Sequence, residues 1–146
     1  MASFLFATPY SLAGVYAGVL SGKVNRKKML ALACIFWSLA TFGSGAFSSF
    51  ALFCTMRFLI GFFESACNPA SYSLISDYFP QEYRSTANAI ETSGSYVGGG
   101  LSALSVLIIK KWGWKAMYKL TGGFGILMGI IAYFGIKEPK RGVFDT

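Results

Sequence analysis

The sequence predicts an all-α protein, a polytopic transmembrane bundle of five helices. Three uncharged runs carry this prediction, residues 1–22, 29–56 and 92–109. A helix of about 20 apolar residues crosses the hydrocarbon layer of a bilayer, and each run is about that long or longer. Hydrophobic residues make up 54% of the chain and charged residues only 13%, and the charges gather between the apolar runs.

Turn signals divide the chain into single helices. The first uncharged run forms one span and ends at the basic loop 22–28. The run 29–56 is too long for one span and too short for two, so the Gly- and Ser-rich segment 43–49 places a short turn inside it. Pro80 cannot continue a helix and ends the third span. The Trp and Lys residues of 110–115 fit the aromatic belt at a membrane surface, between the fourth and fifth spans. The predicted spans cover about residues 3–21, 27–46, 50–76, 84–109 and 115–136.

Basic residues predict the orientation. Lys and Arg concentrate in the cytoplasmic loops of membrane proteins, and the loop 22–28 holds four of them and no acid. We therefore expect the N-terminus outside or lumenal and the C-terminus in the cytoplasm. The inner side then holds eight basic residues, Lys23, Arg26, Lys27, Lys28, Arg84, Lys137, Lys140 and Arg141. The outer side holds four, Lys110, Lys111, Lys115 and Lys119.

Composition also excludes several classes of function. The chain has no His, which excludes His-based metal or acid–base chemistry. Its three Cys residues lie in apolar stretches without metal-ligand spacing, and no nucleophile–base set is visible, so we expect neither an enzyme nor a bound cofactor or metal. The surplus of 13 basic over 6 acidic residues would suggest nucleic acid for a soluble protein, but membrane orientation explains it here.

Several motifs resemble the major facilitator superfamily. Gly18-x-Leu-Ser-Gly22-Lys-x-Asn-Arg26-Lys27 is similar to the family's Gly-x-Leu-Ala-Asp-Arg-x-Gly-Arg-Lys loop between the second and third helices. The segment 57–65, Arg-Phe-Leu-Ile-Gly-Phe-Phe-Glu-Ser, resembles the fourth-helix pattern Arg-x-x-x-Gly-x-x-Glu-Ala. Asn25-Arg26-Lys27, Phe36-Trp37-Ser38 and Glu138-Pro139 look most like the Spinster group, while organic-anion and hexuronate carriers remain alternatives.

The resemblance implies that residues 1–146 form a partial N-terminal domain, helices two to six of a twelve-helix fold. The chain is then expected to be a fragment or a degenerate copy of such a protein. Secondary active transport of a small organic or amphipathic solute, including an anionic lipid-like one, would proceed by alternating access in the full-length protein. The alternative function is a non-transporting membrane unit used in assembly or as a scaffold. The expected partners are the bilayer, a small-molecule solute and protons or another coupling ion.

Charges inside the spans mark the candidate solute site. Arg57 and Glu64 are seven residues apart, so they share one helix face at a separation of about 10 Å. An ionisable residue at this depth is costly and usually faces a cavity or a partner. Arg57 could hold an anionic group and Glu64 could carry a proton, or both could serve structural ion pairs. Glu91 is shallower, and Asn68 could hydrogen-bond the solute or merely another helix.

The resemblance also implies a gate on the inner side. In the family, the loop arginine approaches an acid at the end of the fourth helix, so we expect Arg26 and Asp77 to pair; solvated surface charges are the alternative. Gly22 stands where the family usually has Asp, which predicts a weaker gate. Gly94 and Gly98 lie in a glycine-dense segment that predicts close helix packing or local bending. The expected gating residues are Gly18, Gly22, Lys23, Arg26, Lys27, Asp77 and Arg84.

Overall fold

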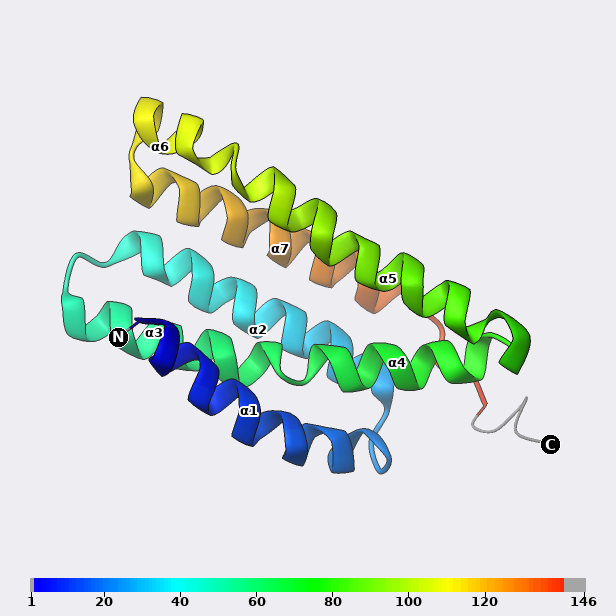
Figure 1. Ribbon diagram of the computed structural model, residues 1–146. Coiled ribbons are helices and arrows are strands. Elements are labelled where there is room, and N and C mark those ends of the chain that lie inside the picture. Colours follow the sequence, from blue (N-terminus) through cyan, green and yellow to red (C-terminus); the bar gives the residue numbers. More distant parts are fainter. Residues whose placement is uncertain (1, 141–146) are drawn as a thin grey trace.

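The computed structural model describes residues 2–140, and every regular element in that range is a helix (Figure 1). The helices are α1 (Ala2–Ser21), α2 (Arg26–Ala46), α3 (Phe50–Glu64), α4 (Cys67–Tyr78), α5 (Gln81–Ser102), α6 (Ser105–Trp112) and α7 (Trp114–Gly135). Within the described range they provide five spans long and apolar enough to cross a membrane, with α3–α4 and α5–α6 each counting as one. The predicted all-α bundle is confirmed, and the boundaries of the spans differ from the expected ones by three residues or fewer.

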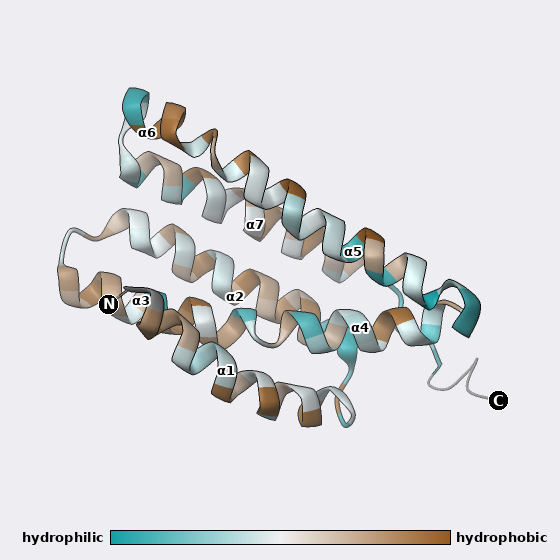
Figure 2. Ribbon diagram, in the orientation of Figure 1, coloured by the Kyte–Doolittle hydropathy of each residue, from teal (hydrophilic) through white to brown (hydrophobic). Residues whose placement is uncertain are grey.

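The spans alternate in direction. The α1–α2 loop, the α4–α5 turn and the end of α7 lie at one end of the bundle, and the α2–α3 and α6–α7 turns lie at the other (Figure 1). The most hydrophilic segments include the α4–α5 and α6–α7 turns, at opposite ends (Figure 2). We call the end that carries the α1–α2 loop the inner end, following its basic charge. Arg141, one of the basic residues expected there, lies outside the described residues.

Local chemistry fixes the turns. Asn25 adopts an extended conformation before α2, and its side-chain oxygen accepts a hydrogen bond of 2.9 Å from the backbone N–H of Lys28. This cap satisfies one of the free donors in the first turn of the helix. Between α6 and α7, Gly113 has a φ of +83°, a conformation that other residues rarely adopt. The α1–α2 and α6–α7 turns therefore each rest on a residue suited to the local backbone geometry.

The third span is interrupted at its middle, which corrects the continuous helix expected over 50–76. The ring of Pro69 has no N–H to offer the carbonyl of Ser65 and would clash with it in a regular helix. The backbone N–H of Ala66 bonds the Phe63 carbonyl at 3.2 Å, one residue short of the α-helical spacing. The Ser65 hydroxyl donates to the Phe62 carbonyl at 2.7 Å instead. A side chain thus supplies the hydrogen bond that the backbone gives up.

The fourth span is interrupted as well, between α5 and α6, which agrees with the local bending that its glycines predict. Ala103 and Leu104 donate to carbonyls three residues earlier, at 3.2 and 3.0 Å. The Ser102 hydroxyl donates to the Gly99 carbonyl at 2.6 Å. The break follows three consecutive glycines, 98–100, which weaken a helix because they leave the backbone unrestrained.

Helix α2 is the centre of the bundle. It packs along α7 and also contacts α3 and α4 (Figure 1). Glycines of α7 allow the close approach: a Cβ atom added to Gly122 would lie 2.5 Å from the backbone nitrogen of Phe42, and one added to Gly129 would lie 2.7 Å from Ile35. Without a hydrophobic driving force between helices in lipid, such close backbone contact stabilises the pair through dispersion.

The glycines expected to pack closely do not do so within this chain. A Cβ atom added to Gly94 or Gly98 would meet no other atom within 4 Å. Helix α5 lies at the edge of the bundle and has no buried residue. These glycines therefore meet no neighbouring helix among residues 2–140, and their part in helix packing stays a prediction.

The α2–α7 contact generates a prediction with an adjacent control. Gly122→Ala should lower the free energy of unfolding by about 1–3 kcal/mol, because the added methyl group overpacks the interface. Gly123→Ala should leave stability unchanged or slightly raised, since a Cβ there meets no atom within 4 Å. Chemical denaturation of both variants in detergent measures the difference. Equal stability of the two variants would contradict the close approach.

Candidate functional site: an inner ion cluster and an intramembrane polar face

Arg26 and Asp77 form an ion pair at the inner end of the bundle. The contact joins Nη2 of Arg26, at the start of α2, to Oδ2 of Asp77, in the last turn of α4. Both residues are buried, with exposed fractions of 4% and 5%. The predicted pairing is confirmed, and burial rules out the alternative of two solvated surface charges.

The guanidinium of Arg26 is held by two further residues. Its Nη1 donates to the backbone carbonyl and the hydroxyl of Ser73, at 3.0 and 2.7 Å. Its Nε lies 3.5 Å from Oε1 of Glu138, which follows α7. We call Arg26, Ser73, Asp77 and Glu138 the inner ion cluster.

Glu138 also caps α2. Its two carboxylate oxygens accept hydrogen bonds from the backbone N–H groups of Arg26, at 3.2 Å, and of Lys27, at 2.8 Å. A carboxylate at a helix N-terminus satisfies free donors and is stabilised by the helix dipole. Nearby, the Tyr78 hydroxyl donates to the Lys137 carbonyl, and the Lys27 ammonium lies 5.4 Å from the ring centre of Tyr133. The cluster therefore joins the inner ends of α2 and α4 to the segment after α7.

Sequence reasoning missed Ser73 and Glu138 as members of this cluster. Glu138 was noticed only as part of a motif at the end of the last span. Its signal was available, since Glu138 is the only acid between Lys137 and Lys140 and lies at the same membrane face as Arg26. Ser73 gave no signal, because a serine one helical turn before Asp77 is common on any helix.

The other expected gating residues lie outside the inner ion cluster. Gly18 accepts a hydrogen bond of 2.7 Å from the Ser21 hydroxyl at the end of α1. Gly22 and Lys23 are exposed in the loop, and the Lys23 N–H bonds the Leu20 carbonyl at 2.9 Å. Arg84 donates from Nε to the Phe79 carbonyl at 3.2 Å, beside the α4–α5 turn.

Arg57 lies in an aromatic setting on the outer half of the bundle. Its guanidinium carbon lies 5.2 Å from the ring centre of Phe53 and 5.4 Å from that of Tyr118 on α7. Nη2 of Arg57 donates to the Tyr118 hydroxyl. Trp114 packs edge-on against both rings, at centroid distances of 6.4 and 6.1 Å. Rings at this distance stabilise a cation through their negative faces, which lowers the cost of burying Arg57.

Glu64 is the last residue of α3 and lies directly at the break of the third span. It forms no ion pair with any residue of the described range, Arg57 included. Asn68, one turn further on, donates from Nδ2 to the Tyr10 hydroxyl of α1 at 2.8 Å. The structure thus joins Asn68 to Tyr10 one helical turn after Glu64, at mid-span, and leaves Arg57 apart from this group.

Glu91 lies apart from Arg57 and Glu64. It lines a cavity of about 340 Å³ on the inner half, together with Leu30, Ser71, Tyr78 and the end of α7. This places Glu91 beside the inner ion cluster and away from the expected solute site. In the part of the chain that is described, no three His, Cys, Asp or Glu side chains lie together as metal ligands would.

Comparison with known proteins places these features in a family. The sequence profile of the Major Facilitator Superfamily matches residues 1–146. A D-galactonate transporter of Escherichia coli O6:H1 is 28% identical over 137 residues, which cover 93% of this chain and 32% of that protein. Protein spinster homolog 1 of Homo sapiens is 28% identical over 145 residues, which cover 97% of this chain and 28% of that protein. The chain spans about one third of the length of these curated relatives.

A solved structure is similar over nearly the whole chain. It is the crystal structure of a bacterial homolog to the human lysosomal transporter Spinster, in an inward-facing and occupied conformation. The two chains superpose with a TM-score of 0.81 at 27% identity, over 97% of this chain and 37% of that one.

The inner ion cluster generates a prediction on stability. Asp77→Asn should lower the free energy of unfolding by about 3–5 kcal/mol, because it leaves the buried Arg26 charge without its main partner. Exchanging the charges, Arg26→Asp with Asp77→Arg, should recover only part of that loss, since Glu138 would repel a carboxylate at position 26. Chemical denaturation of the single and double variants gives the coupling energy. Glu82→Gln, at an exposed acid of α5, is the control and should change little, whereas additive single effects would mean that no pair exists.

Proposed function

Because this chain belongs to the Major Facilitator Superfamily, we propose that residues 1–146 are part of the N-terminal domain of a secondary transporter. The transported solute is a small organic or amphipathic anion. Several relatives are named as transporters. Two of the named solutes, D-galactonate and galactarate or D-glucarate, are sugar acids and therefore carboxylates. A carboxylate solute agrees with the half-buried Arg57 in the third span.

The observation that carries this proposal is the incomplete hydrogen bonding of Arg57. Its Nη2 bonds Tyr118, but its Nε is buried and has no hydrogen-bond partner within residues 2–140. Buried polar groups are nearly always satisfied, so an unmet donor calls for an acceptor. A carboxylate could accept from Nε and a terminal nitrogen together, the bidentate geometry for which a guanidinium is suited. Phe53 and Tyr118 would hold the guanidinium plane in place for it.

Glu64 is the proposed proton carrier. It lies at a mid-span helix break, the depth and setting in which secondary transporters bind solutes and coupling ions. Its carboxylate is half-buried and forms no ion pair among the described side chains, so a proton is the simplest means of neutralising it. Asn68 and Tyr10 supply neutral hydrogen-bonding groups at the same level.

The inner ion cluster is the proposed cytoplasmic gate. It joins three segments that must separate if the inner end opens, and each of its contacts would have to break for that to happen. Alternating access would then couple opening of this end to occupancy of the solute site. The excess of basic residues at this end favours a cytoplasmic inner face and an N-terminus outside or in a lumen.

Binding of D-galactonate and of decanoate, one hydrophilic and one amphipathic carboxylate, tests the solute site. Arg57→Lys and Arg57→Gln should each weaken binding about tenfold or more, because a charge-assisted hydrogen-bond pair is worth at least about 1.5 kcal/mol. Isothermal titration in detergent measures the affinity. Lys119→Gln, which removes an exposed charge from α7, is the matched control and should bind normally.

The same titrations, repeated in buffers of different ionisation enthalpy, report protons exchanged on binding. Glu64→Gln should abolish that exchange while leaving anion affinity within a few-fold of the unaltered protein. Unchanged proton exchange would remove Glu64 from the proposed role. If the unaltered protein binds neither carboxylate, or if Arg57→Gln binds as well as Lys119→Gln, the solute site is assigned wrongly.

A further inference from the structure

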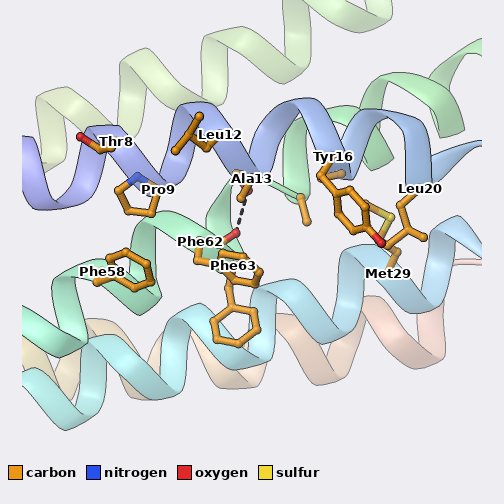
Figure 3. Close-up of a pocket in the computed structure, with 13 residues that line it drawn as sticks. Thr8, Pro9, Leu12, Ala13, Tyr16, Leu20, Met29, Phe58, Phe62 and Phe63 are labelled. Atoms are coloured by element: carbon orange, nitrogen blue, oxygen red, sulfur yellow. Dashed lines mark hydrogen bonds between the residues drawn. The ribbon is translucent and has the colours of Figure 1, made fainter.

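A long apolar groove runs between α1 and α3. Figure 3 shows Pro9 and Ala13 of α1 on the side toward Phe58 and Phe62 of α3, and Leu20 farther along α1 near Met29 of α2, at the inner end. The groove encloses about 470 Å³, within the range of about 300–1,000 Å³ of sites that hold small molecules. A groove of this volume is large enough for a small-molecule ligand and larger than a packing defect.

The lining accepts hydrocarbon and excludes polar solutes. Thr8, Tyr16 and Ser65 are the only polar residues that line the groove. The Ser65 hydroxyl already donates to the Phe62 carbonyl, so it offers little to a ligand. A sugar acid placed here would lose its hydration without replacement hydrogen bonds, at a cost of several kcal/mol. An alkyl chain has no such cost.

The groove has the length of one lipid leaflet. From Thr8 to Leu20 it follows twelve residues of α1, about 18 Å at the helical rise. The hydrocarbon core of a bilayer is about 30 Å thick, so one leaflet contributes about 15 Å. A chain that enters at Leu20 would end just beyond the bilayer midplane, near Thr8.

Basic charge lies at the inner end of the groove. Lys23 is exposed three residues after Leu20, and Lys28 is exposed directly before Met29. Neither forms an ion pair with a residue of the described range, and the first acid in the sequence is Glu64. The remaining cations of the loop are engaged, since Arg26 is in the inner ion cluster and Lys27 lies over Tyr133. Two lysines are therefore available to a phosphate at the level of the headgroups.

We propose that this groove binds one acyl chain of an anionic phospholipid from the inner leaflet, with the lipid phosphate held between Lys23 and Lys28. The groove lies on a different face of α3 from Arg57 and Glu64, about 100° around the helix. The bound lipid is therefore a resident partner of the transmembrane bundle and does not depend on the solute site.

Quenching by brominated lipid tests the occupant directly. Phe62→Trp places a fluorophore in the groove, and Val15→Trp places one on the outer face of α1, where the side chain is 74% exposed. Vesicles contain equal amounts of phosphatidylglycerol and phosphatidylcholine, with brominated chains on one lipid at a time, and the signal of the native Trp residues is subtracted. We expect the ratio of phosphatidylglycerol to phosphatidylcholine quenching to be at least about fivefold at position 62, because the attraction of one lysine alone would give that ratio, and near unity at position 15.

A second experiment removes the charges of Lys23 and Lys28. Lys23→Gln with Lys28→Gln should bring the ratio at position 62 to unity, and Lys110→Gln with Lys111→Gln, at the outer end, should leave it unchanged. All four Lys side chains are exposed, so these variants should fold like the unaltered protein. Equal quenching by both lipids at position 62, or a preference that survives loss of Lys23 and Lys28, would overturn the proposal. Protection of position 62 from both lipids, together with self-association, would assign the groove to a second copy of the chain.

Discussion

A buried guanidinium at the inner end of α2 is the interaction on which the rest of the structure depends. An unpaired charge in an apolar environment is unstable, so Arg26 requires acceptors from every side. Asp77 and Ser73 come from α4, and Glu138 comes from the segment after α7. The demand of one side chain thus brings together three segments that are distant in the sequence. Glu138 serves twice, because its carboxylate also caps the helix that carries Arg26.

The need of a charge in an apolar environment for partners also distinguishes Arg57 from Glu64. Arg57 is stabilised by the rings of Phe53 and Tyr118, yet its buried Nε has no hydrogen-bond partner among residues 2–140. Glu64 lies at a break where a proline and a serine hydroxyl have already altered the backbone hydrogen bonding. Irregular backbone inside a membrane is tolerated where it is buried in protein or lines a cavity. Incomplete pairing and a helix break in the same span are the features that suggest a binding site there.

Much of the fold could be predicted from the sequence, because uncharged runs and basic loops report directly on the bilayer. The family resemblance and the Arg26–Asp77 pair are confirmed as well. The break in the third span was not predicted, since Pro69 is compatible with a transmembrane helix until its neighbours are known. Glycine spacing does not specify helix rotation, so it could not show that Gly122 meets another helix while Gly94 meets none within residues 2–140. Contacts between distant segments, such as Arg57 with Tyr118, follow from helix rotation and leave no local pattern.

The most direct test of the central claim is the distance between the inner ends of α2 and α5, measured by electron–electron double resonance. Spin labels at Lys28→Cys and Gln81→Cys, with the native Cys residues replaced, report the inner end; labels at Ser49→Cys and Lys111→Cys report the outer end. All four positions are exposed. If the Arg26 contacts hold the inner end closed, Asp77→Asn lengthens and broadens the inner distance and leaves the outer distance unchanged. An inner distance that is the same with and without Asp77 would contradict the account.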